Sequence, residues 1–501
     1  MRGRRAIRHF GLFLLYGVLG AFVALLVVYI VHLHRLPETQ LWHRVHLDAE
    51  FEAKDAKTVR TLDDYRRVED RVFEQLEREI CARVAEGGRL SLNRFAPGSR
   101  SNPLTRRPNW NRTFVLDVPQ PRGGVLLLHG LTDSPYSLRA IAEWFHACGF
   151  VAIGLRLPGH GAAPSGLHDV RMEDLEAAVR LGARAVREAI GPGKPLVIVG
   201  YSMGAALAVD YELARVQGED LPRPAALVLV SPAIGVSRAA AFARLQGRLE
   251  PVPGLSGAAW TSILPEYDPY KFNSFAVNGA HQMYRITRSI GARLDALAGP
   301  QGVAGVAPIL AFQSVADGTV STEAVVDALF RRLAPGGHAL VLFDLNRFTA
   351  ALSLMLPSAR EPREQLLEGP PLPFDVTVLT NEDPESGALV ALHRPAGSAE
   401  VAREPTDLVW PQGVFSLSHV ALPFAPDDPL YGARRRPGDD GIFLGWPEVR
   451  GERGVLLLDP GTFLRLRHNP FFPYVEARLE GLVAGLPPAA AASPPAADAA
   501  P

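Results

Sequence analysis

Residues 196–214 contain the pattern with the clearest chemical meaning. The apolar run Leu196–Val199 is typical of a buried strand, and an alanine-rich helical pattern begins directly after Gly204. Between them lies the pentapeptide Gly200-Tyr201-Ser202-Met203-Gly204. At a strand-to-helix turn, Gly-x-Ser-x-Gly forms a nucleophile elbow that needs glycines and holds the serine hydroxyl up at the end of the sheet. The alternative is an ordinary glycine-serine turn, but this context favours Ser202 as a nucleophile.

A serine hydroxyl is a weak nucleophile, so it needs a base, an orienting acid and donors for the oxyanion. A second buried-strand run, Gly124–Leu128, leads into the loop His129–Pro135. The backbone N–H groups of Met203 and Leu131 are the expected oxyanion donors. His129 is an alternative base, but it precedes the glycine through which the loop approaches a substrate. We interpret it as a residue that shapes the loop.

The orienting acid is expected at the end of a later strand. Pro308–Gln313 has the composition of such a strand, and residues 314–320 form the loop that leaves it. Asp317 lies in this loop. Its alternative interpretation is a solvated turn aspartate, because Asp317-Gly318 is a common turn pair. The order along the chain favours Asp317 as the acid.

Histidines that follow Asp317 are the candidates for the base, namely His338, His393, His419 and His468. His419 ends the strand-like run that begins at Val414 and enters a loop, the setting in which a hydrolase base is expected. We therefore predict that Ser202, Asp317 and His419 form a catalytic triad, with His468 as the second candidate for the base.

Four spaced motifs together make the sequence resemble an α/β-hydrolase of the monoacylglycerol lipase, lysophospholipase and serine-aminopeptidase-like branch. The resemblance covers about residues 113–345 and returns near His419, and the long interval between Asp317 and His419 departs from the compact pattern of the branch. It implies that His160 has a structural role in its loop. The motifs are residues 129–134, residues 156–161, residues 200–204 and Asp317.

Apolar runs alternating with helical patterns predict the fold class, α/β with a mostly parallel sheet flanked by helices. The resemblance implies an α/β-hydrolase domain over 113–483, with a helical cap at about 234–305 whose aromatic residues line an acyl pocket or pack the cap onto the sheet. Residues 346–410 form an extra insertion with strand-like runs. The predicted strands lie near 124–128, 151–155, 196–199, 226–231, 308–313, 376–380 and 389–392.

The amino terminus predicts a membrane anchor. Residues 1–9 form a basic tail with four arginines, and residues 10–31 are apolar over a length that spans a bilayer core. The positive-inside rule keeps the tail cytoplasmic, so we expect a single-pass protein of the inner membrane with its catalytic domain on the periplasmic side. The alternative is a cleaved signal peptide, but the sequence near His32–Pro37 offers no small-residue cleavage site.

Two further segments have distinctive compositions. Residues 32–112 are expected to hold a stalk helix, amphipathic over Thr61–Glu86, and a linker; the helix could also pack on the domain. Residues 484–501 are almost only Ala and Pro, so we expect a disordered tail.

Composition narrows the choice of partners and cofactors. The formal net charge of −1 argues against nucleic-acid binding, and the spacing of Cys81 and Cys148 fits no metal motif. We expect no metal and no cofactor, and the protein partners are unknown.

The expected function is a membrane-anchored serine hydrolase that forms an acyl-enzyme on Ser202. The resemblance and the anchor imply a small amphiphilic carboxylic ester as substrate, such as an acylglycerol or a lysophospholipid, together with contact with the lipid bilayer. The alternatives are a peptidase or amidase of the same fold and a non-catalytic binding scaffold.

Overall fold

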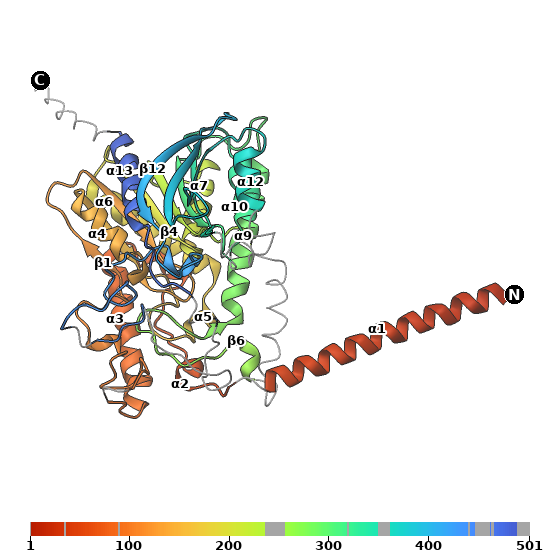
Figure 1. Cartoon of the computed structure of the whole chain (residues 1–501). Helices are drawn as coiled ribbons and strands as arrows, with labels where there is room; N and C mark the ends of the chain where they lie inside the picture. Colours follow the sequence, from red (N-terminus) through yellow and green to blue (C-terminus); the bar gives the residue numbers. More distant parts are fainter. Residues whose placement is uncertain are drawn as a thin grey trace, which may run out of the picture.

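A ten-stranded sheet forms the centre of the molecule (Figure 1). The computed structural model describes residues 2–34, 37–88, 91–235, 256–317, 320–348, 361–438, 441–445, 461 and 465–487. The central strands of this sheet run parallel to one another; they are β3, β2, β4, β5, β8, β9 and β10. Strands β1, β11 and β12, at its two edges, pair antiparallel with their neighbours. In spatial order they are β1 (Phe114–Leu116), β3 (Phe150–Leu155), β2 (Gly123–Leu128), β4 (Leu196–Tyr201), β5 (Ala226–Val230), β8 (Ile309–Ser314), β9 (Ala339–Phe343), β10 (Asp375–Asn381), β11 (Ala388–Arg394) and β12 (Ala402–Val409).

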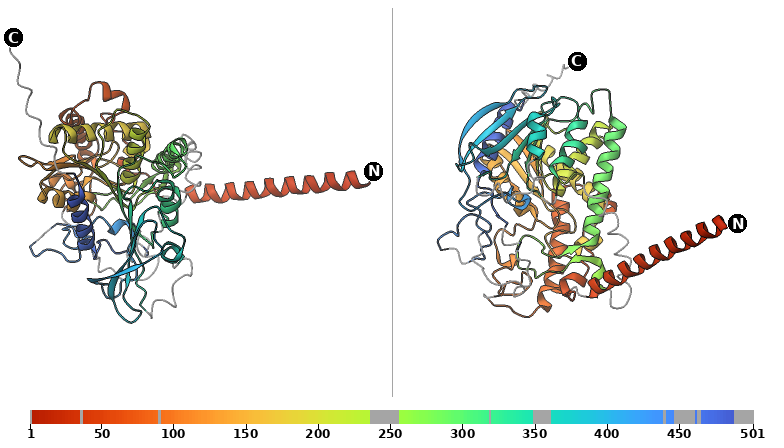
Figure 2. Two further views of the ribbon diagram at one scale, coloured as in Figure 1. Left: turned by 90° about the horizontal axis from the view of Figure 1, so that it is seen from above. Right: turned by 45° about the vertical axis from the view of Figure 1, so that its right-hand side comes forward.

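Helices cover both faces of the sheet, which makes a three-layer α/β/α architecture and confirms the predicted fold class (Figure 2). One face packs against α6 (Met172–Ile190), α7 (Met203–Val216), α9 (Val277–Leu297) and α10 (Thr322–Ala328). The other packs against α4 (Arg139–Ala147) and α13 (Phe472–Gly485). Because both faces are buried, the central strands are continuous apolar runs rather than alternating ones.

The parallel strands bring the candidate loops to one edge of the sheet. Leu128 of β2 pairs with Gly200 of β4, Tyr201 pairs with Val230 of β5, and the next parallel strand is β8, which ends at Ser314. The loops after β2, β4 and β8 therefore leave the same carboxyl edge, where α/β folds bind their ligands.

The region predicted as a cap is described only in part, since residues 236–255 lie outside the described residues. Its described remainder holds the two-stranded sheet of β6 (Trp260–Ser262) and β7 (Phe275–Ala276) and then α9. Helix α9 contacts α7, α6 and the short α5 (Gly166–Asp169), so its apolar residues join the core on that face of the sheet.

The segment between the amino-terminal helix and β1 packs on the α/β/α domain. Helix α3 (Leu62–Glu79) begins with a capping box, in which the Thr61 hydroxyl accepts from the Asp64 N–H and Asp64 accepts from the Thr61 N–H. Its Tyr65 is fully buried and donates a hydrogen bond to the Arg156 carbonyl at 2.8 Å. The amphipathic helix predicted here is therefore part of the core, next to the one-turn α2 (Leu41–Arg44).

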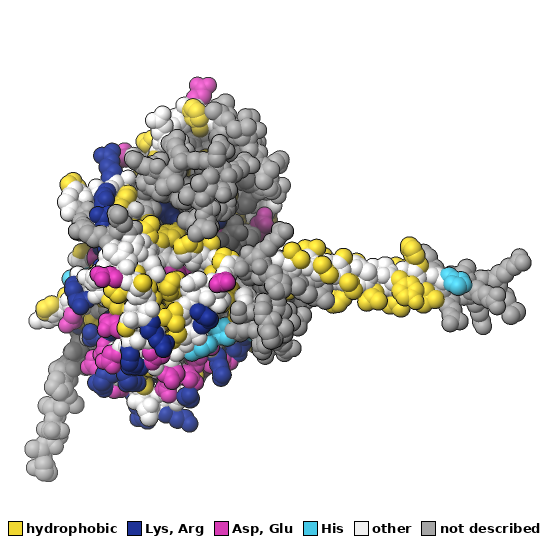
Figure 3. Space-filling model, turned by 90° about the horizontal axis from the view of Figure 1, so that it is seen from below, with side chains coloured by type: hydrophobic (Ala, Val, Ile, Leu, Met, Phe, Trp, Pro, Cys, Tyr) yellow, Lys and Arg dark blue, Asp and Glu magenta, His cyan; other side chains and the backbone are white. Residues whose placement is uncertain are grey.

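Helix α1 (Arg2–His34) extends away from the rest of the chain (Figure 1). Within it, Gly11–Tyr29 has a mean hydropathy of 2.6 and none of it is buried; it is long and apolar enough to cross a membrane, and a signal sequence meets the same criterion. Figure 3 shows its hydrophobic side chains at the surface of the protruding helix.

The carboxyl-terminal part of the chain extends the sheet. Strands β10 and β11 coincide with the runs predicted at 376–380 and 389–392, and a third strand, β12, follows at the edge. Residues 349–360 lie outside the described residues, and helix α12 (Glu361–Glu368) precedes β10. The predicted Ala/Pro tail begins within α13, and its residues 488–501 also lie outside the described residues.

Candidate active site

Ser202 lies at the turn between β4 and α7 with φ 52° and ψ −112°. A non-glycine residue with positive φ is strained, and such strain is typical of functional turns. The surrounding backbone maintains this conformation: the Ser202 N–H donates to the Val230 carbonyl at 2.9 Å, and the Ser202 carbonyl accepts from the Ala233 N–H at 3.2 Å. The geometry is that of a nucleophile elbow.

The two glycines of the pentapeptide allow this turn to form. A Cβ on Gly204 would lie 1.9 Å from the Leu128 carbonyl oxygen, and a Cβ on Gly200 would lie 2.4 Å from the Cα of Ala205. Both neighbours are backbone atoms, which cannot move aside without shifting an element. Glycine at these positions therefore lets the start of α7 contact the end of β2.

The predicted oxyanion donors come from the two loops joined by this contact. Within the described residues, neither the Leu131 N–H nor the Met203 N–H donates a hydrogen bond to another protein atom. Free amide donors at a helix start and an adjacent loop are the groups that stabilise a developing oxyanion. The segment after β6 is attached to the Leu131 loop, because the Phe272 N–H donates to the Thr132 carbonyl at 2.8 Å.

Asp317 and His419 lie next to each other although 102 residues separate them in the sequence. His419 Nδ1 is 3.4 Å from Asp317 Oδ1, and both residues are largely buried. Asp317 is itself held in place: Oδ2 accepts from Gln313 Nε2 at 3.2 Å, and Oδ1 accepts from the Val320 N–H at 2.9 Å. The structure thus brings together two of the three predicted triad residues. Between the described atoms of Ser202 and His419 no hydrogen bond is formed.

The loop that carries His419 is attached to the sheet edge at two points. The Ser314 hydroxyl, at the end of β8, donates to the Leu417 carbonyl at 2.7 Å. Asn346, just after β9, donates from its backbone N–H to the Phe415 carbonyl at 2.9 Å and from its side chain to the Val414 carbonyl at 2.9 Å. These bonds position a distant part of the chain beside Asp317.

The surroundings of His419 favour its neutral form. Burial, followed by the positive charges of Lys271 and Arg465, lowers the pKa of His419 to about 3. Lys271 also donates to both oxygens of the buried Asp133 carboxylate, at 3.2 and 3.3 Å. A neutral imidazole is the form that can accept the proton of a serine hydroxyl. Lys271 and Asp133 were not predicted, because no local motif links residues so far apart in the sequence.

The other histidines have structural partners. His129 Nδ1 contacts the Gly130 carbonyl at 2.9 Å, and its Nε2 accepts from the Leu157 N–H at 3.0 Å, so its ring ties two loops together. His160 contacts the Pro158 carbonyl, and His393 contacts Thr377. His468 is buried next to the Tyr431 backbone.

Three aromatic residues of the predicted cap are packed against other side chains. Trp260 and Phe272 are 2% exposed and belong to the main core. Tyr270 stacks on Tyr136 with ring centroids 4.1 Å apart. The packing interpretation therefore applies to these three residues, and the pocket stays a prediction.

Both cysteines, Cys81 and Cys148, are free thiols. Burial raises the pKa of Cys81 to about 11, which suppresses its reactive thiolate.

The middle part of the chain is similar to known proteins. Residues 119–345 match the family model described as serine aminopeptidase, S33. A monoacylglycerol lipase from Mycolicibacterium smegmatis is 34% identical over 138 residues, which are 26% of this chain and 47% of that protein. A thermostable monoacylglycerol lipase from Bacillus sp. is 31% identical over 86 residues, 17% of this chain and 33% of that protein. The chain thus spans less than half the length of either curated relative that it matches.

Among solved structures, the monoacylglycerol lipase of Paleococcus ferrophilus aligns with 46% of this chain and 87% of its own, at 19% identity and a TM-score of 0.35. The family match ends at residue 345, so His419 lies beyond it. The match contains Ser202, Asp317 and both candidate oxyanion donors. Residues 119–345 thus resemble the serine aminopeptidase S33 family, and shorter segments of the chain are similar to two monoacylglycerol lipases.

Proposed function

We propose that the protein is a membrane-anchored serine hydrolase that cleaves carboxylic esters through an acyl-enzyme on Ser202. The observation that supports this most directly is the strained Ser202 at the same sheet edge as the Asp317–His419 pair. An elbow serine, a buried acid and a neutral imidazole are the three groups that acyl transfer requires.

In this mechanism the neutral His419 takes the Ser202 hydroxyl proton as the oxygen attacks the ester carbonyl. The Leu131 and Met203 N–H groups donate to the oxyanion, and Asp317 stabilises the imidazolium at Nδ1. The imidazolium then protonates the leaving alcohol, which departs and leaves the acyl group on Ser202. Water, deprotonated by the same imidazole, attacks the acyl-enzyme and releases the carboxylic acid and the free serine.

The proposed substrate is a small amphiphilic ester such as an acylglycerol or a lysophospholipid. Two relatives named as monoacylglycerol lipases support the acylglycerol class. The apolar helix α1 supports access to such substrates, because a tethered enzyme meets lipids at the bilayer surface.

Covalent labelling tests the nucleophile. Treatment of the detergent-solubilised full chain with a fluorophosphonate should give one adduct, which mass spectrometry should locate on Ser202. Ser202→Ala should abolish labelling and lower the rate of ester hydrolysis by at least about 10³-fold. Ser231→Ala is the matched control, because Ser231 also follows a central strand with positive φ (43°). Equal labelling of Ser202→Ala would refute the proposal and favour a binding scaffold.

The family description supports a second candidate, a peptidase or amidase acting through the same residues. Matched substrates distinguish the two: acyl esters of 4-nitrophenol against acyl amides of 4-nitroaniline with the same acyl group. We expect turnover of the esters only. Faster turnover of aminoacyl anilides would assign the protein to the peptidases.

We further propose that α1 is an uncleaved anchor, with the catalytic domain on the periplasmic side of the inner membrane. Protease added to spheroplasts should then digest the catalytic domain, and the intact protein should keep residues 2–34. A protected domain, or a mature chain that begins after residue 31, would contradict this topology.

A further inference from the structure

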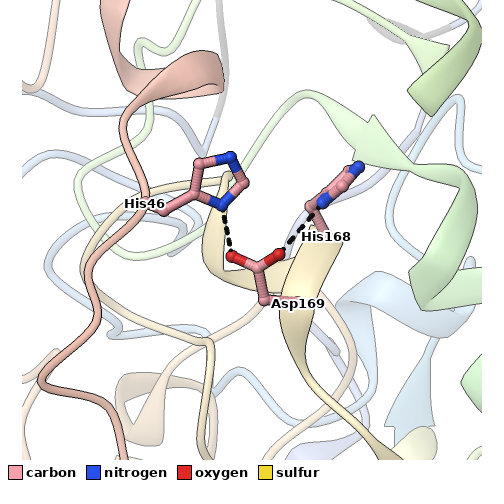
Figure 4. A group of neighbouring side chains, drawn as sticks. All are labelled: His46, His168 and Asp169. Atoms are coloured by element: carbon pink, nitrogen blue, oxygen red, sulfur yellow. Dashed lines mark hydrogen bonds and ion pairs between the residues drawn. The ribbon is translucent and has the colours of Figure 1, made fainter. Parts of the chain in front are cut away.

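His46, His168 and Asp169, none of which belongs to the candidate active site, form a compact cluster (Figure 4). His46 Nδ1 lies 2.5 Å from Asp169 Oδ2, and His168 Nδ1 lies 3.1 Å from Asp169 Oδ1. The potential ligand atoms all lie within 4.8 Å of one another. Tetrahedral Zn²⁺ with bonds of about 2.0–2.2 Å places its ligand atoms roughly 3.3 Å apart. Small side-chain rotations would therefore bring all three atoms to one ion.

The backbones that carry these residues are fixed on both sides of the cluster. On one side of His46, the Trp42 carbonyl accepts from the Ser165 N–H at 3.3 Å, just before α5. On the other side, the Ala53 N–H donates to Asp174 Oδ1 at 2.7 Å, at the start of α6. Two segments more than 100 residues apart in the sequence are thus held together independently of the cluster, which reduces the entropy cost of binding an ion there.

The cluster is open to solvent and carries the charge that a cation requires. The side chains of His46 and Asp169 are about half exposed, and both line a surface pocket of about 290 Å³. Through this pocket an ion has a path from solvent to the Asp169 carboxylate.

We propose that His46, His168 and Asp169 form a surface site for a divalent transition metal of the Zn²⁺ class. Two imidazoles and one carboxylate match the donors that Zn²⁺ prefers and leave a fourth position for water, whereas Mg²⁺ and Ca²⁺ select sites made of oxygen alone. His46 follows His34, the last residue of α1, by 12 residues. The ion would therefore clamp the segment that leaves the apolar helix onto α5 of the catalytic domain.

Metal titration of the full chain, purified in detergent without a polyhistidine tag, tests the site. Calorimetry with Zn²⁺ should give one site per chain, and Co²⁺ should give visible absorption bands of a tetrahedral complex. His46→Ala, His168→Ala and Asp169→Asn should each weaken binding by at least about 100-fold, since loss of an outer-shell partner alone costs 10–100-fold. His46→Cys should retain binding, because a thiolate replaces the imidazole as ligand.

The controls separate this site from general cation binding and from the proposed hydrolase activity. His146→Ala removes a histidine whose contact is the Asp117 carbonyl, so it should leave Zn²⁺ binding unchanged. Zn²⁺ should raise the melting temperature of the wild type and of Ser202→Ala alike, because a ligand bound to the native state stabilises it. Equal Zn²⁺ affinity in Asp169→Asn, absence of binding by the wild type, or equally tight binding of Mg²⁺ would each overturn the proposal.

Discussion

His419 is a buried imidazole with a carboxylate on one side and two cationic residues nearby. Its pKa of about 3 lies well below the ordinary value of 6.5, with burial as the main cause and Lys271 and Arg465 as further ones. Because a base works only when unprotonated, activity is lost as the pH falls through the pKa of the free enzyme's base. The acid limb should therefore lie below the pH at which an exposed histidine titrates.

The first prediction concerns this acid limb. The midpoint of the fall in kcat/KM for a short soluble ester should lie clearly below pH 6.5, the ordinary pKa of histidine, as measured over the pH range in which the protein stays folded. Arg465→Gln removes one nearby positive charge, so it should move the midpoint upward. Arg403→Gln, at the distant edge strand β12, is the control and should leave it unchanged. A midpoint at the ordinary histidine value that neither variant moves would show that His419 is not the titrating base.

Gly204 allows a second prediction at the scale of one residue. Gly204→Ala should lower the free energy of unfolding by at least about 3 kcal/mol, because the new Cβ would lie 1.9 Å from the Leu128 carbonyl oxygen. Gly481→Ala is the control, since Gly481 lies in α13 and a methyl group added there would have no neighbouring atom within 4 Å. It should instead raise stability by about 0.5–1 kcal/mol.

Denaturant titration measures both glycine variants. Gly204→Ala with unchanged stability would mean that α7 does not contact the end of β2 as described.

At the scale of elements, the candidate site depends on strands that the family match does not include. Strands β10, β11 and β12 follow β9 and extend the sheet, and the chain then returns to deliver His419 at the carboxyl edge. Ser314 at the end of β8 is one of the two residues that attach this returning loop to the sheet edge. We therefore interpret Ser314 as a positioning residue for His419.

Ser314→Ala should lower kcat by about tenfold with little change in KM, because the imidazole loses its orientation while the substrate site is kept. Thr406→Val is a matched control: each hydroxyl donates to a backbone carbonyl and accepts from the N–H two residues later, but Thr406 lies in β12. Both variants should lose about 1 kcal/mol of stability. Equal effects on kcat would assign Ser314 a purely structural role.

Several of these elements can be predicted from the sequence, and where the prediction fails, it fails for a physical reason. The runs around Val197 in β4, Val228 in β5 and Leu310 in β8 are apolar on both faces, so local composition identifies them as buried parallel strands. Strand β12 was missed because Arg403 and Glu404 give it the polarity of an exposed segment, which an edge strand tolerates.

The candidate site, too, contains residues that the sequence predicts and contacts that it does not. The elbow around Ser202 is a local motif, and the sequence order suggested Asp317 and His419. The contacts of Lys271 with Asp133, and of His46 with Asp169, join residues more than 100 positions apart. No local pattern encodes such contacts, because they arise only when the whole chain is packed.

At the scale of the whole molecule, the segment after α1 is an integral part of the α/β-hydrolase fold. Glu50 forms a two-point ion pair with the fully buried Arg156 and accepts from the Gly159 N–H at 2.9 Å. Although burial opposes ionisation, Arg156 lowers the pKa of Glu50 below its ordinary value. The pair therefore contributes stability above the pKa of a free glutamate, and this stability is lost as the pH falls through the lowered pKa.

Glu50→Gln should therefore destabilise the protein by about 3–5 kcal/mol at neutral pH, because it leaves the Arg156 charge buried without its partner. Glu52→Gln is the control: its ion pair with Lys54 is exposed, so its loss should change stability by less than about 1 kcal/mol. Thermal unfolding of both variants measures the difference. Equal small effects would show that the amino-terminal segment is only loosely attached.

The late position of His419 in the chain also has a consequence for biosynthesis. Ribosomes add roughly 5–20 residues per second, so the 102 residues from Asp317 to His419 take on the order of 5–20 s to make. Once residue 345 has been added, the nascent chain contains the whole family-matched region but not yet the proposed base. In the proposed mechanism, an unfinished or prematurely terminated chain would thus be inert, and ester hydrolysis would begin only after translation has passed His419 and the returning loop has folded.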